Sequence, residues 1–243
     1  MKTWITQLIV AASVVLFIST GVKAQERTEL TQQIEEINQI LQEHPAIVPD
    51  LLASLHNYLE SRQQSQQALQ AHHGWLYQND ATHPWMGASN PELTLVVFTD
   101  YDCPYCKRLD PHLQKLVQEY PQVKVISVLV PLRKQQLAGS PVNSAEFGLN
   151  VWHDNPANYP QVENLMYRKN GLHDANSIRQ VAQRSETSSL IKSNTQVKQA
   201  IDRNYRVFTE LGLRGTPAIL IGEGVIPGYV EYEQLEEVVR SQL

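Results

Sequence analysis

The chain has 243 residues, of which 42% are hydrophobic and 19% charged, and its formal net charge is -5 at pH 7. These values are typical of a globular protein of one or two domains, and the acidic balance excludes a basic nucleic-acid-binding surface. The two cysteines are too few for a disulfide-stapled small protein or a four-cysteine zinc site.

The first 24 residues have the pattern of a cleaved export signal. Lys2 precedes an apolar run over residues 8–18, and the sequence Val-Lys-Ala at positions 22–24 offers a cleavage site after Ala24. The run is too short to cross a bilayer, so we expect no stable membrane anchor, a retained anchor being the alternative. Export would place the two thiols in an oxidising compartment.

Residues 25–72 form a Gln-rich segment without glycine, in which the apolar residues have helical spacing. His44-Pro45 interrupts the pattern, and Pro49-Asp50 favours the start of a second helix. Two short helices cannot bury two apolar stripes alone. The segment therefore packs on the domain that follows or, as we expect, acts as an oligomerisation arm. Its stripes are Leu30, Ile34, Ile37 and Leu41, then Leu51, Leu52, Leu55 and Leu59.

Residues 73–243 predict an α/β domain, because short apolar runs typical of buried strands alternate with helical patterns. A loop-rich joint is expected over residues 74–91. A long, mainly helical stretch is expected at about residues 140–211, and an amphipathic helix closes the chain. The predicted strands cover residues 93–99, 123–130, 217–221 and 225–226.

The chemistry is predicted at Cys103 and Cys106, which open a helix directly after a buried strand and are separated by Pro104 and Tyr105. A cysteine at a helix start faces unpaired N–H groups and the positive end of the dipole, which favour its thiolate. Cys106 lies one turn later on the same face and can form a disulfide with Cys103. We therefore expect Cys103 to attack a substrate disulfide and Cys106 to resolve the mixed disulfide.

Other roles for this pair are a structural disulfide, half of a metal site, or capture of Cu(I) by two thiolates. A closed zinc site would need two more ligands. The His72-His73 pair lies at the joint without ligand spacing, and we interpret it as surface residues. For His153 and His173 we expect solvated or hydrogen-bonded side chains.

The segments FTDYDCPYCKRLDPHL (98–113) and LRGTPAILIGEGVIPGY (213–229) resemble the exported DsbA-like branch of the thioredoxin superfamily. The resemblance covers about residues 93–243 and implies a thioredoxin fold with an inserted helical domain at about 140–211. The segment HPAIVPDLLASLHNYLE in the arm resembles the N-terminal region of ScsC-type proteins, a family linked to copper tolerance. Some of its members oligomerise through this region and isomerise disulfides.

The resemblance also implies roles for residues around the cysteines. It implies a cis peptide bond before Pro217 and contacts of Thr216 and Pro217 with an extended substrate strand. Pro104 and Tyr105 would modulate the site. The strongest oxidants of the family have His at the position of Tyr105, so Tyr105 argues against a very low Cys103 pKa and for isomerase-type members.

The implied protein is a periplasmic thiol:disulfide oxidoreductase, either an isomerase or an oxidase, acting on the cysteines of exported proteins. It needs no dissociable cofactor, because the dithiol itself stores two electrons. The implied redox partner is a membrane protein of the DsbB or DsbD/ScsB type.

Overall fold

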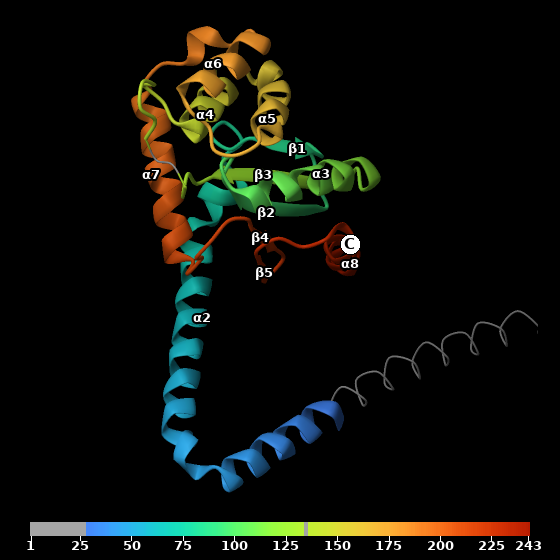
Figure 1. Ribbon diagram of the computed structural model, residues 1–243. Helices are drawn as coiled ribbons and strands as arrows, with labels where there is room; N and C mark the ends of the chain where they lie inside the picture. The colour runs from blue at the N-terminus through green and yellow to red at the C-terminus, as the bar shows by residue number, and fades with distance from the viewer. Residues whose placement is uncertain (1–27, 134–135) are drawn as a thin grey trace, which may run out of the picture. The chain divides into compact units, whose positions relative to one another are not determined.

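The computed structural model describes residues 28–133 and 136–243 (Figure 1). The export signal predicted at residues 1–24 lies outside the described residues. The described helices include none that is both long and apolar enough to cross a membrane. The chain divides into two compact units, one ending at Glu60 and the other comprising Ser61–Leu243.

The first unit is helical and keeps its apolar stripes exposed. Residues 28–43 form one helix, and the short 3₁₀ helix η1 (Pro45–Ile47) leads directly into α2 (Val48–Tyr77), which continues into the second unit. The break falls at His44, which has non-helical torsion angles, as expected before a proline. Every stripe residue except the half-buried Leu41 is exposed. This unit thus buries no apolar core among its described residues.

The second unit is built on a five-stranded sheet with the strand order β1-β3-β2-β4-β5. Strands β2 and β3 are parallel, and the other neighbouring pairs are antiparallel. The central strands are buried on both faces, which explains their nearly continuous apolar sequences. The strands are β1 (Trp85–Gly87), β2 (Leu93–Thr99), β3 (Val123–Leu129), β4 (Ala218–Ile221) and β5 (Gly224–Pro227).

Helices cover both faces of this sheet, which confirms the predicted α/β class. Leu95 and Val97 of β2 face α3 (Pro104–Glu119) and α8 (Tyr232–Gln242). The alternate residues Val96 and Phe98 face the last turns of α2 and α7 (Thr195–Glu210). The prediction of a loop-rich joint over residues 74–91 is wrong in two places, because this range contains the end of α2 and the strand β1. Helix α2 runs to Tyr77 because Leu76 is buried against the sheet, and β1 pairs with β3.

The predicted helical stretch is present between β3 and β4. Its first helices α4, α5 and α6 form a group at the top of Figure 1, and α7 runs from there along the last turns of α2. Capping boxes at Asn143 and Asp174 fix the starts of α4 and α6. The elements are α4 (Ser144–Asp154), η2 (Pro156–Asn158), α5 (Tyr159–Arg168), α6 (Ala175–Arg184), η3 (Ser188–Leu190) and α7.

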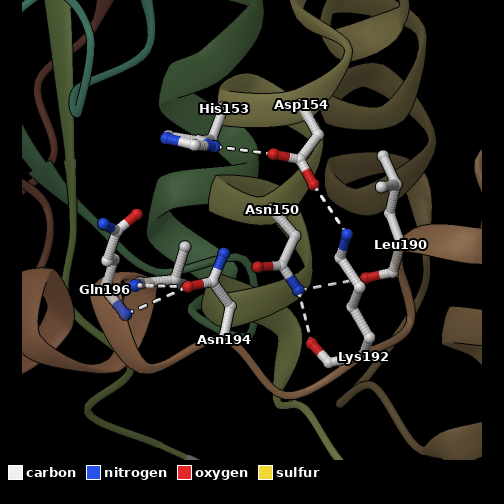
Figure 2. A network of polar contacts seen from close by, with 8 residues as sticks. Asn150, His153, Asp154, Leu190, Lys192, Asn194 and Gln196 are labelled. Carbon is white, nitrogen blue, oxygen red and sulfur yellow. Dashed lines mark hydrogen bonds and ion pairs between the residues drawn. The ribbon is translucent and has the colours of Figure 1, made fainter.

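A polar network joins α4 to the chain between η3 and α7 (Figure 2). The buried Asn150 amide donates to the main-chain oxygens of Leu190 and Lys192, at 3.0 and 2.8 Å. Asp154 pairs with the Lys192 ammonium at 2.9 Å and with His153, which is exposed and hydrogen-bonded as predicted. The network orients the start of α7, whose far end packs on the sheet.

Candidate active site

Cys103 lies at the N-terminus of α3, immediately after the loop that follows β2. It is the N-cap residue, with extended torsion angles, and Pro104 occupies the first helical turn, where a missing N–H leaves no intrahelical hydrogen bond unmade. The main-chain N–H of Cys103 donates to the oxygen of Asp100 at 3.0 Å. The tight loop and the helix start thus place the first cysteine where the sequence predicts it.

The structure brings Cys103 against Thr216, the residue before Pro217. The two thiols are free and nearly buried, with 4% of Cys103 and 2% of Cys106 exposed. The Cys103 Sγ atom lies 3.1 Å from the main-chain oxygen of Thr216. The peptide bond between Thr216 and Pro217 is cis, as the resemblance implies. The residues before β4 and at the start of α3 therefore form one site.

The environment separates the two thiols electrostatically. Hydrogen bonds to the Cys103 sulfur, first from the Cys106 thiol and then from the Cys106 N–H, the Thr216 side chain and the Tyr105 N–H, outweigh desolvation and lower its pKa to about 5. Burial, together with the neighbouring Cys103 thiolate, raises the pKa of Cys106. At neutral pH Cys103 is thus the thiolate and Cys106 keeps its proton, the distribution that an attacking and a resolving thiol require.

Two buried aspartates shape the loop before the cysteines. Asp100 accepts hydrogen bonds from the N–H groups of Asp102 and Arg133, at 2.8 and 3.1 Å, and burial raises its pKa to about 6. Asp102 accepts from the Ser144 hydroxyl at 2.8 Å and from the N–H of His173. These bonds tie the active-site loop to the helical insertion.

The cationic residue nearest the cysteines in sequence is also held by the insertion. The Lys107 ammonium donates to the main-chain oxygens of Lys169 and Gly171, at 2.6 and 2.7 Å. His173 is buried, and its ring nitrogens lie within hydrogen-bond distance of the Ser177 hydroxyl and the Met166 oxygen, as expected for a hydrogen-bonded histidine.

A buried polar cluster near Cys106 was not predicted from the sequence. Tyr101 and Tyr159 share a hydrogen bond of 2.6 Å between their hydroxyls, and the Tyr159 hydroxyl donates to Glu163 at 3.3 Å. Burial raises the pKa of Glu163 to about 8 and that of Asp110, one turn after Cys106 on α3, to about 7. The sequence shows that Asp110 lies one helical turn after Cys106, but it does not show that α5 brings Tyr159 and Glu163 into the same cluster.

A second unpredicted feature is Tyr229, which follows β5 and lies beside Tyr105. Tyr105 itself is 52% exposed, whereas the two cysteines are buried. Within residues 28–133 and 136–243, no three His, Cys, Asp or Glu side chains are grouped so that they could hold a metal ion.

Comparison with known proteins finds relatives with this fold. Residues 79–241 match the family described as Thioredoxin. A linker-deletion mutant of ScsC from Proteus mirabilis is 36% identical with a TM-score of 0.71, covering 83% of this chain and 93% of that chain. A periplasmic thioredoxin-like protein from Salmonella enterica serovar Typhimurium is 35% identical with a TM-score of 0.62, covering 70% and 94%. Disulfide bond formation protein D of Bacillus subtilis (strain 168) is 21% identical over 178 residues, covering 66% and 77%.

Proposed function

Because the chain belongs to the thioredoxin family, among its DsbA-like members of the ScsC type, we propose that it exchanges disulfides with the cysteines of exported proteins. By this membership it is a thiol:disulfide oxidoreductase. The observation that carries the proposal is the asymmetry of the two thiols, one favoured as thiolate beside Thr216 and the other buried and protonated.

In the reducing direction, the Cys103 thiolate attacks one sulfur of a substrate disulfide and forms a mixed disulfide. The substrate disulfide breaks, and its other sulfur leaves as a thiolate that takes a proton. Cys106 then loses its proton, attacks the Cys103 sulfur and releases the second substrate thiolate. The protein dithiol is oxidised by two electrons and the substrate disulfide is reduced, so no dissociable cofactor is required.

The substrate segment is proposed to lie in extended conformation along Thr216 and Pro217. A strand added beside this segment would hydrogen-bond through its main chain, which gives affinity with little sequence preference. The contact of the Thr216 oxygen with the Cys103 sulfur supports this position, because a strand paired with Thr216 would lie next to the reacting atom.

The exposed stripes of the first unit support self-association through residues 25–72. An isomerase must hold a misfolded substrate while several disulfides are attacked, and joined catalytic units raise the effective concentration of thiolate. We therefore propose a homo-oligomeric isomerase in the periplasm. A membrane protein of the DsbB or DsbD/ScsB type would set its redox state and hence the direction of exchange.

The test combines refolding of a scrambled-disulfide substrate with the reduction potential of the Cys103–Cys106 pair. We expect Cys106→Ser to accumulate mixed disulfides with substrate and Cys103→Ser to form none. Titration with Cu(I) tests the competing hypothesis that the protein is a copper-binding protein, since two thiolates also suit that ion. Stoichiometric Cu(I) binding without any disulfide exchange would contradict the proposed function.

A further inference from the structure

Two buried hydroxyl groups, those of Thr99 and Tyr167, lie beside the resolving cysteine. Thr99 is the last residue of β2, and its hydroxyl lies 2.7 Å from that of Tyr167 on α5. Burial raises the pKa of Tyr167 well above its ordinary value, so this hydroxyl keeps its proton. The two residues are therefore a neutral, hydrogen-bonded pair that joins the end of a central strand to the helical insertion.

The Thr99 hydroxyl is also a hydrogen-bond partner of the Cys106 sulfur. The Thr99 side chain and the Asp100 main chain both form hydrogen bonds that favour the Cys106 thiolate, which identifies them as donors. Cys106 is nearly buried, so its sulfur has little access to the water that would otherwise stabilise a negative charge. Thr99 thus offers a side-chain donor to the sulfur that must ionise away from solvent.

The order of these hydrogen bonds follows from the number of protons. A hydroxyl group has one proton to donate and two lone pairs that can accept. When Thr99 donates to Cys106, its oxygen is left to accept from Tyr167, whose hydroxyl is then the donor of the 2.7 Å bond. Hydrogen bonds in such a series polarise one another, so Tyr167 makes Thr99 a better donor.

We propose that Thr99 is a catalytic residue of the resolving step, donating a hydrogen bond to the Cys106 thiolate, and that Tyr167 is a positioning residue that acts through Thr99. This inference rests on the proposed function and assigns a group to its second step. In the mixed disulfide, water takes the Cys106 proton, and the Cys106 thiolate attacks the Cys103 sulfur. The bond between Cys103 and the substrate breaks, and the substrate thiolate leaves and takes a proton from water. Thr99 and Tyr167 keep their protons, and two electrons pass from the protein dithiol to the substrate.

The size of the effect follows from the charge on the acceptor. Loss of a hydrogen bond to a charged group should lower the fraction of Cys106 thiolate about 10- to 100-fold. A more basic thiolate attacks faster, which offsets about half of this effect on a logarithmic scale. Thr99→Val should therefore slow the resolving step about 3- to 10-fold. Thr99→Ser keeps the hydroxyl and should stay within about 2-fold of the wild-type rate.

The test follows the reaction of the reduced, full-length mature protein with dithiobis(nitrobenzoic acid), a small symmetric disulfide. Attack by Cys103 releases one coloured nitrothiobenzoate ion and resolution by Cys106 releases the second, so stopped-flow absorbance separates the two steps. Cys106→Ser should show only the first release, which identifies the phases. Thr99→Val should slow the second release alone. Tyr167→Phe should slow it by less, and the double variant should be no slower than Thr99→Val, because Tyr167 acts through Thr99.

Thr187→Val is the matched control, because Thr187 is a buried threonine between α6 and η3 whose hydroxyl lies 2.8 Å from that of Ser185. It should leave both releases at their wild-type rates. A second release at the wild-type rate in either Thr99→Val or Tyr167→Phe, equal slowing in Thr99→Val and Thr99→Ser, or additive losses in the double variant overturns the inference. If the wild-type protein still gives two releases in these cases, the proposed function stands. If the wild-type protein gives none, both fail.

Discussion

In its protonated form, the Cys103 thiol donates a hydrogen bond to the main-chain oxygen of Thr216 at 3.1 Å, although 113 residues separate the two in sequence. This bond exists only while the sulfur carries its proton. When Cys103 ionises, the Thr216 oxygen loses its donor and can accept an N–H from an added substrate strand. Ionisation of Cys103 and release of the Thr216 oxygen from its hydrogen bond are therefore linked at the Cys103 sulfur.

Alkylation should show the difference between the thiols directly. The pKa of Cys103 is lowered to about 5, first by the Cys106 thiol, so its reaction with iodoacetamide should already be fast at pH 6. Cys106 should remain unmodified, because burial raises its pKa. Cys106→Ala should shift the pH profile of Cys103 labelling upward, since the strongest hydrogen bond to the sulfur is lost. Mass spectrometry after timed labelling measures both effects, and faster labelling at Cys106 would reverse the assigned roles.

The buried carboxyls Asp110 and Glu163 should make the oxidised protein less stable as the pH rises. Burial raises their pKa values from 3.8 and 4.5 to about 7 and about 8. Between the unfolded and folded pKa values the folded state binds more protons. Each group then lowers the free energy of unfolding by up to about 1.4 kcal/mol per pH unit. Urea unfolding at pH 5 and pH 8 should show this loss.

Asp110→Asn should reduce the difference in unfolding free energy between the two pH values, and Glu163→Gln should reduce it further in the double variant. The oxidised protein is used because the titration of Cys103 is then absent. Asp202→Asn, which removes an exposed carboxyl of α7, serves as the control. An unchanged pH dependence in the double variant would show that these carboxyls are ionised in the folded state.

The ion pair between the buried Lys124 of β3 and the exposed Asp80 should affect stability most when only Asp80 is removed. Lys124 is 5% exposed, its ammonium lies 2.7 and 2.8 Å from the Asp80 oxygens, and it is 4.4 Å from the Trp85 ring centroid. Asp80→Ala leaves the cation without its partner and should cost about 1–3 kcal/mol of unfolding free energy. Adding Lys124→Met to Asp80→Ala should recover most of that loss in urea unfolding. A double variant no more stable than the single one would show that the ion pair is not the cause.

Truncation should separate the arm from the catalytic unit at residue 60. Deletion of residues 25–60 should give a folded monomer that still exchanges simple thiols but loses most disulfide shuffling. Deletion of residues 25–72 should also lower the melting temperature. It removes the hydrogen bond of 2.9 Å from Ser65 to the Leu211 oxygen. It also removes the packing of Leu69 on the hydrophobic cluster between the sheet and α7. Light scattering that finds the intact mature protein monomeric at micromolar concentration would contradict the oligomer.

The features predictable from the sequence are those determined by local pattern. The apolar runs of β2 and β3 indicate buried strands, and Cys103 directly after β2 indicates a helix start with a reactive thiol. Strand β1 has three residues and exists through its pairing with β3, so its own sequence carries no signal. The Tyr101–Tyr159 hydrogen bond joins residues 58 positions apart, and it depends on how α5 packs.

Both active-site cysteines and Tyr101 belong to the hydrophobic cluster of the helical insertion, apart from the two clusters that line the sheet. Tyr101 fits closely against α4, since a Cβ atom on Gly148 would lie 2.8 Å from its ring. The insertion is therefore part of the wall around the dithiol. Exchanging it between relatives would change the surroundings of the two thiols as well as the surface of the protein. Substitutions on α4 and α5 would therefore alter the packing around an unaltered CPYC sequence, although they lie dozens of residues away from it.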